Sequence, residues 1–103
     1  MMQFYEFNGA KVTTTSQLAD LFQVNKKAIT RNYQRNKKRF VEGVHYIRIE
    51  GNPLKEFKMM VGNPDYLKFT AVLYLWTVPG IRLIAKSCRS EEAWHLYEQD
   101  IQV

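Results

Sequence analysis

The residues best suited to chemistry in this sequence are the cations of positions 26–40, read as KKAITRNYQRNKKRF. This stretch holds seven of the chain's 15 Lys and Arg residues and no acid. Four of the seven recur at intervals of four residues: Lys27, Arg31, Arg35 and Arg39. On a helix they become like-charge neighbours, each pair unfavourable by roughly 0.2–0.5 kcal/mol. Exposed helices normally interleave both signs. The pattern therefore predicts a polyanionic partner, because phosphates supply the missing negative charge.

The start of this predicted helix repeats the conflict. Lys26 and Lys27 lie in the first turn, where each cation opposes the helix dipole at a cost of about 0.3–1 kcal/mol. A later helix predicted over 91–101 begins with Glu91 and Glu92, which suit the same dipole. The sequence follows the rule in one helix and breaks it in the other, which indicates a functional reason for the cations.

We expect this helix to enter the major groove of duplex DNA, with Ile29, Tyr33 and Phe40 on its buried side. Arg31 can donate to guanine and Gln34 can pair bidentately with adenine. The side chains expected to face the bases are Lys27, Thr30, Arg31, Gln34 and Lys38. The cations expected to hold phosphates are Lys26, Arg35, Lys37 and Arg39. The neighbouring Asn32 and Asn36 are expected to cap or bond the backbone.

A first helix over 16–22 is predicted to position the cationic one. Thr14 and Gln17 have the spacing of a capping box, and Asn25 can cap the second helix. Only Gln23 and Val24 remain between the two helices, so a steep crossing is expected. This arrangement is that of a helix-turn-helix.

The remaining segments predict an α+β, winged-helix-like fold. Asn8-Gly9 is typical of a two-residue turn in a β-hairpin. Two further strands can pair, and the connection between them can project as a wing carrying cations toward flanking phosphates; Pro79-Gly80 is expected to turn the chain. The expected strands are 3–7, 10–13, 44–49 and 73–77, and the expected further helices are 53–58, 81–86 and 91–101.

Composition agrees with a single DNA-binding domain over residues 1–103. The 46% hydrophobic fraction is that of a folded globule, and the net charge of +5 with a pI near 9.4 favours an anionic partner. A lone Cys88 permits neither an internal disulfide nor a multi-cysteine zinc site. The sequence lacks a signal-peptide pattern and a membrane-spanning stretch, so we expect a cytoplasmic chain with no membrane partner.

Enzymatic chemistry is not expected. His45 and His95 lack an evident nucleophile or metal partner, and the acids Asp20, Glu42 and Glu56 show no catalytic spacing. Glycine-rich phosphate loops and nucleophile elbows are also missing from the sequence. We predict no catalytic residue, no metal and no cofactor.

Several segments together resemble the phage antirepressor N-terminal DNA-binding family, the ORF-six N-terminal domain of the KilA-N group. They are VTTTSQLADLF (12–22), ITRNYQRNKKRFVEGVHY (29–46), LYLWT (73–77), Gly80, Ala85-Lys86-Ser87, Glu92-Ala93-Trp94 and Tyr97-Glu98. The resemblance implies a phage or prophage transcription regulator or antirepressor that binds DNA in the bacterial host cell. Arg82, Ile84 and residues 88–90 depart from the pattern. Many relatives continue into a second domain.

Other partners are compatible with the same residues. The chain can instead be an antirepressor module whose basic helix binds an acidic surface of a repressor protein. RNA is a third possible partner for a basic helix. Trp94, Tyr97 and Ile101 are spaced to pack into the core or against a second subunit, so a homodimer is possible.

Overall fold

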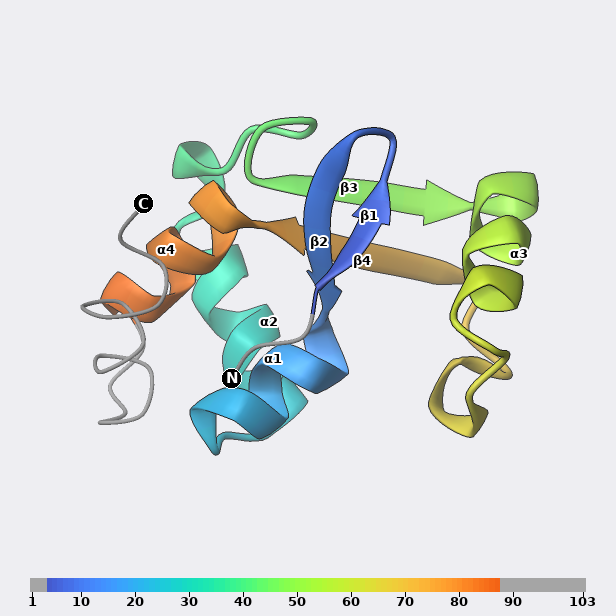
Figure 1. Ribbon diagram of the computed structural model, residues 1–103. Helices are drawn as coiled ribbons and strands as arrows, with labels where there is room; N and C mark the ends of the chain where they lie inside the picture. Colours follow the sequence, from blue (N-terminus) through green and yellow to red (C-terminus); the bar gives the residue numbers. More distant parts are fainter. Residues whose placement is uncertain (1–3, 88–103) are drawn as a thin grey trace.

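The computed structural model describes residues 4–87, which form one α+β domain (Figure 1). Its strands are β1 (Tyr5–Phe7), β2 (Ala10–Thr14), β3 (Tyr46–Glu50) and β4 (Val72–Thr77). Its α-helices are α1 (Thr15–Phe22), α2 (Lys26–Arg35), α3 (Gly51–Met60) and α4 (Val78–Ser87), with short 3-10 helices η1 (Lys37–Arg39) and η2 (Asp65–Leu67). The α+β class expected from the sequence is confirmed.

The strands form an antiparallel sheet in the order β1-β2-β4-β3. Asn8 and Gly9 have φ values of 51° and 81°, as a tight hairpin turn between β1 and β2 requires. The predicted pairing of the two later strands is confirmed, with Tyr46 opposite Trp76 and Arg48 opposite Tyr74. The N-terminal hairpin and this later ribbon therefore share one sheet.

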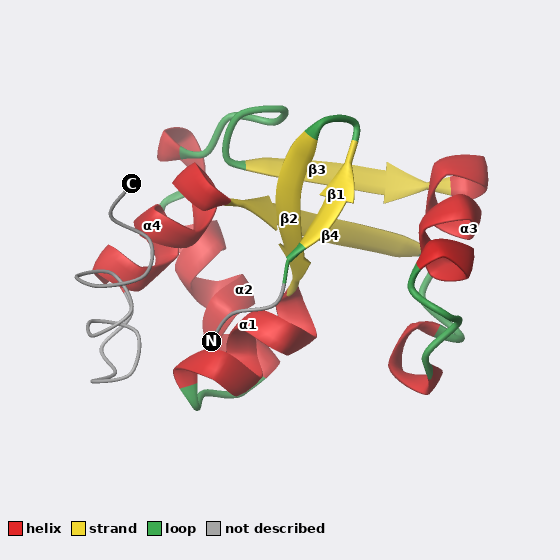
Figure 2. Ribbon diagram, viewed as in Figure 1, coloured by secondary structure: helices red, strands yellow, loops and turns green. Residues whose placement is uncertain are grey.

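Two apolar cores lie on the two faces of the sheet, because side chains alternate along each strand. The first core joins α1, α2 and α4 to the sheet and contains Leu18, Phe22, Ile29, Tyr33, Trp76, Ile81 and Ile84. The second joins α3 and η2 to the sheet and contains Val12, Ile49, Leu54, Phe57, Leu67 and Leu75. In Figure 2, α1, α2 and α4 gather at one end of the domain and α3 at the other.

The connection from β3 to β4 is more helical than the sequence indicated. α3 begins at Gly51, whose φ is +62°, and continues through Met60, so it is longer at both ends than the expected helix over 53–58. The connection then runs through η2 and projects from the end of the sheet remote from α2 (Figure 1). It does not flank α2, so its lysines lie away from that helix.

The predicted turn at Pro79 and Gly80 is not formed. Both residues lie in the first turn of α4. Proline is accepted there because its missing N–H needs no intrahelical partner. The Gly80 N–H instead donates to Thr77 Oγ1 at 3.3 Å. A Cβ on Gly80 would overlap the carbonyl oxygen of His45, so glycine permits the close approach of α4 to the loop before β3. The predicted helix 91–101 lies outside the described residues.

Candidate nucleic-acid interface

Local hydrogen bonds fix the start of α1 and the turn that joins α1 to α2. The capping box is present, with the Gln17 N–H donating to Thr14 Oγ1 at 3.2 Å and the Thr14 N–H donating to Gln17 Oε1 at 3.5 Å. Gln23 ends α1 in the left-handed conformation, at φ 56°. Asn25 then caps α2, its Oδ1 accepting from the Ala28 N–H at 2.9 Å. Both predicted caps are confirmed, and only residues 23–25 separate the helices.

Tyr33 holds α2 against the sheet. Its ring, 7% exposed, lies 5.2–5.6 Å from the rings of four other aromatic residues, measured between centroids: Phe40, Tyr46, Tyr74 and Trp76. Its hydroxyl donates to the Tyr46 hydroxyl at 3.3 Å. Burial, then this contact with Tyr46, raises the pKa of Tyr33. With Ile29 fully buried beside it, the inner side of α2 is fixed and the opposite side faces outward.

The expectation that α2 continues to Phe40 is wrong. The helix ends at Arg35, Asn36 is its C-cap, and Lys37–Arg39 form η1. Phe40 is buried as expected, its ring 5.9 Å from the Trp76 ring between centroids, but it follows η1 rather than continuing α2. Arg39 is therefore not the fourth member of a straight row with Lys27, Arg31 and Arg35.

Asn32 on α2 and Asn36 at its C-cap differ in their contacts. Asn36 Nδ2 donates to the carbonyl oxygen of Asn32 at 3.0 Å, which confirms the expected backbone role for Asn36. Asn32 Oδ1 is buried and has no hydrogen-bond partner. The backbone role expected for the Asn32 side chain is therefore not observed among residues 4–87.

All nine residues expected to contact DNA are exposed. They are Lys26, Lys27, Thr30, Arg31, Gln34, Arg35, Lys37, Lys38 and Arg39. The fold directs every one of them away from both cores, because the inner side of α2 is occupied by Ile29 and Tyr33. The surface they form is called the cationic face below.

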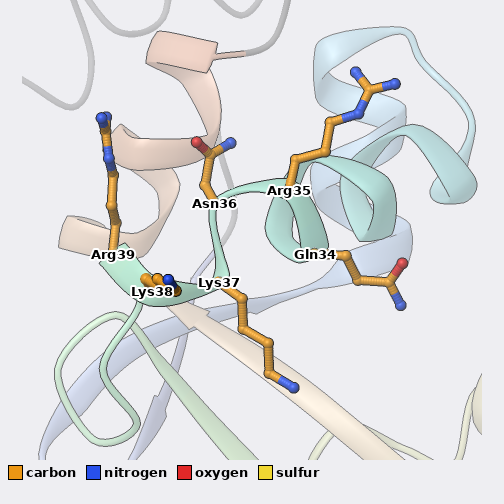
Figure 3. Close-up of a pocket in the computed structure, with 6 residues that line it drawn as sticks. All are labelled: Gln34, Arg35, Asn36, Lys37, Lys38 and Arg39. Carbon is orange, nitrogen blue, oxygen red and sulfur yellow. The ribbon is translucent and has the colours of Figure 1, made fainter.

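The cationic face contains two shallow hollows that share Gln34. The first, about 340 Å³, is lined by Lys26, Lys27, Thr30, Arg31 and Gln34. The second, about 600 Å³, is lined by Gln34, Arg35, Asn36, Lys37, Lys38 and Arg39. Figure 3 shows Arg35, Asn36 and Arg39 extending to one side of the second hollow and Gln34 and Lys37 to the other. The break between α2 and η1 thus spreads the cations around a concave surface.

Asn36 is the lining residue that the sequence reasoning did not place in the site. Its backbone role was recognised, but its exposure to the second hollow depends on the break in the helix after Arg35. A continuous helix would have placed Asn36 on the inner flank. The signal available in the sequence was the position of Asn36 between two cations, Arg35 and Lys37.

Within residues 4–87, the positive charge of the cationic face has no neutralising carboxylate beside it. Among the described residues, no carboxylate lies within salt-bridge distance of its cations, and the ion pair present is Arg48–Glu50 on β3, at 3.3 Å. α2 also has no acid in its first turn. The charge conflict seen in the sequence therefore persists in the folded domain, on an accessible and concave surface.

His45 makes local contacts in the turn before β3. Its Nδ1 accepts from the Val41 N–H at 2.9 Å, and its ring lies against Phe40 in the turn before β3 rather than within a strand as predicted. Among residues 4–87 no group of three metal-binding side chains occurs. His95 and Cys88 lie outside the described residues. None of the described helices is long and apolar enough to cross a bilayer.

Fold and surface together define a small α+β domain with an exposed cationic helix beside a short interhelical turn. The family model of the ORF6N domain matches residues 2–87, and the chain belongs to this family. The ORF6N domain is the N-terminal domain of phage antirepressor-like proteins and is related to KilA-N, and the family is not known as enzymatic. No curated protein and no solved structure matches the chain. The resemblance identified in the sequence is confirmed.

Proposed function

We propose that this chain is a DNA-binding domain of a phage or prophage transcription regulator or antirepressor, and that α1 and α2 act as a helix-turn-helix. The observation that carries the proposal is the cationic face, on which all nine expected residues are exposed without a neighbouring carboxylate among the described residues. Membership of the ORF6N family supports the same class of partner.

In this proposal α2 enters the major groove and reads base edges through the first hollow. Arg31 and Lys27 donate to guanine, Gln34 pairs with adenine and Thr30 contacts a thymine methyl or a phosphate. Lys38, on η1, extends toward a neighbouring base pair. A major groove about 12 Å wide admits one helix, and the inner side of α2 stays on its own sheet.

Phosphates are held by Lys26 at the start of α2, by Arg35 at its end and by Lys37 and Arg39 on η1. The break after Arg35 lets η1 cations follow a curved strand that a straight helix would leave behind. Phosphate contacts of this kind set register and orientation and make affinity depend on salt.

Paired substitutions test the assignment of the cationic face. We expect Lys27→Ala with Arg31→Ala to weaken binding to selected duplex DNA by about 30-fold to 10⁴-fold, since two base contacts worth about 1–3 kcal/mol each are lost. Fluorescence anisotropy measures the affinity and circular dichroism confirms folding.

The matched control removes the same charge elsewhere. Lys11→Ala with Lys55→Ala takes two exposed cations from β2 and α3, away from the cationic face, and should change affinity less than threefold. Equal losses in the two double variants would show only a net-charge effect. If the Lys27→Ala, Arg31→Ala variant binds duplex DNA as tightly as the wild type, the assignment is refuted. If an RNA competitor displaces the labelled DNA from the wild-type protein more effectively than unlabelled duplex DNA does, the preferred partner is RNA.

A further inference from the structure

The sheet face that carries α2 is covered by helices at only one end. On this face β3 and β4 place three cross-strand pairs in line: Tyr46 with Trp76, Arg48 with Tyr74, and Glu50 with Val72. Packing identifies the face, because Tyr46, Tyr74 and Trp76 belong to the first core, whereas the strand residues between them belong to the second. Arg48 therefore lies on the same side of the sheet as α2.

Exposure along this face increases from the Trp76 end to the Val72 end. Trp76 is 2% exposed, Tyr74 is half-buried and Val72 is 37% exposed. On β3 the side chains of Arg48 and Glu50 are 41% and 58% exposed. The two strands run from the end of the domain that holds α2 toward α3, so the helices leave the far half of the face open (Figure 1). We call its four residues, Arg48, Glu50, Val72 and Tyr74, the flanking strip.

The flanking strip begins where the contact between α2 and the sheet ends. The Tyr33 ring of α2 lies 5.4 Å from the Tyr46 ring and 5.6 Å from the Tyr74 ring, between centroids. Arg48 follows Tyr46 by two residues, which is about 6–7 Å along a strand. A helix with its side chains has a radius of about 5–6 Å. Arg48 is thus placed beside α2 rather than beneath it.

The Arg48 guanidinium is held by neighbours on the strip. Its Nη2 lies 3.3 Å from Glu50 Oε2. The Glu50 carboxylate, and to a smaller extent the Tyr74 hydroxyl, raise the pKa of Arg48. An exposed ion pair of this kind contributes only about 0–1 kcal/mol to stability. Because a guanidinium has five N–H donors, these neighbours orient Arg48 and leave donors for a further acceptor.

We propose that Arg48 binds a phosphate of the DNA strand that borders the major groove occupied by α2. This contact deepens the function proposed above and rests on it. The major groove is about 12 Å wide, close to the diameter of a helix with its side chains, so a phosphate backbone runs directly alongside an inserted helix. Arg48 lies on that flank, and its planar fork can hold two phosphate oxygens. The contact sets the orientation of α2 without reading a base.

Fluorescence anisotropy with the 103-residue chain and a selected duplex tests this contact. Arg48→Ala should weaken binding about 5-fold to 30-fold and reduce the magnitude of the log–log salt slope by about 0.9, because one phosphate is no longer neutralised. Lys55→Ala is the matched control. It removes an exposed cation from α3, which packs on the other face of the sheet, and should change affinity less than about twofold.

Glu50→Gln provides a test of opposite sign. The variant removes the carboxylate that competes with a phosphate for Arg48, so binding should become about twofold to fivefold tighter. Glu50 makes no side-chain cap bond at the start of α3, so the substitution leaves that helix end intact. Circular dichroism and urea denaturation verify the fold of each variant.

Two results would overturn the Arg48 contact while leaving DNA binding in place. In the first, Arg48→Ala binds as tightly as the wild type, although Lys27→Ala with Arg31→Ala does not. In the second, Arg48→Ala and Glu50→Gln weaken binding equally, which would assign the ion pair a structural role. A wild-type chain that binds no duplex DNA would instead refute the proposed function, and the phosphate contact with it.

Discussion

At the scale of single residues, Tyr33 links the cationic face to the core. Its ring packs among the aromatic residues of the sheet while the residues beside it on α2 face outward. The hydroxyl bond to Tyr46 and the burial of the ring both favour the neutral phenol, which is why the pKa of Tyr33 is raised. The stability of the cationic face therefore depends on the protonation of a buried phenol beneath it.

This raised pKa predicts alkaline sensitivity. A group whose pKa is higher in the folded state contributes stability that is fully present below its unfolded value, about 10 for Tyr, and is lost as pH rises above it. Tyr33→Phe has no proton to lose, so its free energy of unfolding should fall less between pH 9 and about 11. Urea titrations at several pH values measure the difference. Parallel pH profiles for the two proteins would contradict this role.

Gly80 provides a second residue-scale prediction. Alanine is normally better than glycine in a helix by about 1 kcal/mol, yet a Cβ here would overlap the His45 carbonyl oxygen. We therefore expect Gly80→Ala to lose about 1–3 kcal/mol of stability as the backbone is forced apart. Chemical denaturation measures the sign, and a more stable alanine variant would show that the close approach is dispensable.

At the scale of elements, α2 has a well-packed inner side and a destabilising first turn. Asn25 caps the helix and Ile29 and Tyr33 bury its inner side, while Lys26 and Lys27 oppose its dipole. If the cations are present for a polyanion, the helix should gain stability when they are removed and lose affinity at the same time. Stability and binding then move in opposite directions.

Lys26→Glu examines this opposition. The acid suits the helix dipole, so the melting temperature should rise and the free energy of unfolding should increase by about 0.6–2 kcal/mol. Affinity for duplex DNA should fall at least about tenfold. Lys55→Glu makes the same charge change in the exposed middle of α3 and should alter both quantities little. A Lys26→Glu variant that loses stability would remove the physical basis of the argument from charge placement.

At the scale of the whole molecule, the features predicted from the sequence are those encoded by near neighbours. The Asn8-Gly9 turn, the Thr14–Gln17 capping box and the Asn25 cap each depend on residues within a few positions. The exposure of the cationic residues also followed, because the inner side of α2 could be identified from its apolar spacing.

The features that the sequence did not predict depend on contacts between distant segments. Phe40, which follows the end of α2, packs on Trp76, and Gly80 of α4 lies against the backbone of His45. The second hollow of the cationic face follows from that helix end. The extension of α3 through Met60 and the 3-10 helix η2 were also not predicted.

The most direct test of the central claim is the salt dependence of binding to duplex DNA. Four proposed phosphate contacts, from Lys26, Arg35, Lys37 and Arg39, predict that log affinity falls linearly with log salt at a slope of about −3.6, or about −4.5 with the further contact from Arg48. Lys37→Ala should reduce the magnitude of the slope by about 0.9. A slope near zero, or one that the loss of Lys37 leaves unchanged, would contradict the claim that the cationic face neutralises a nucleic-acid backbone.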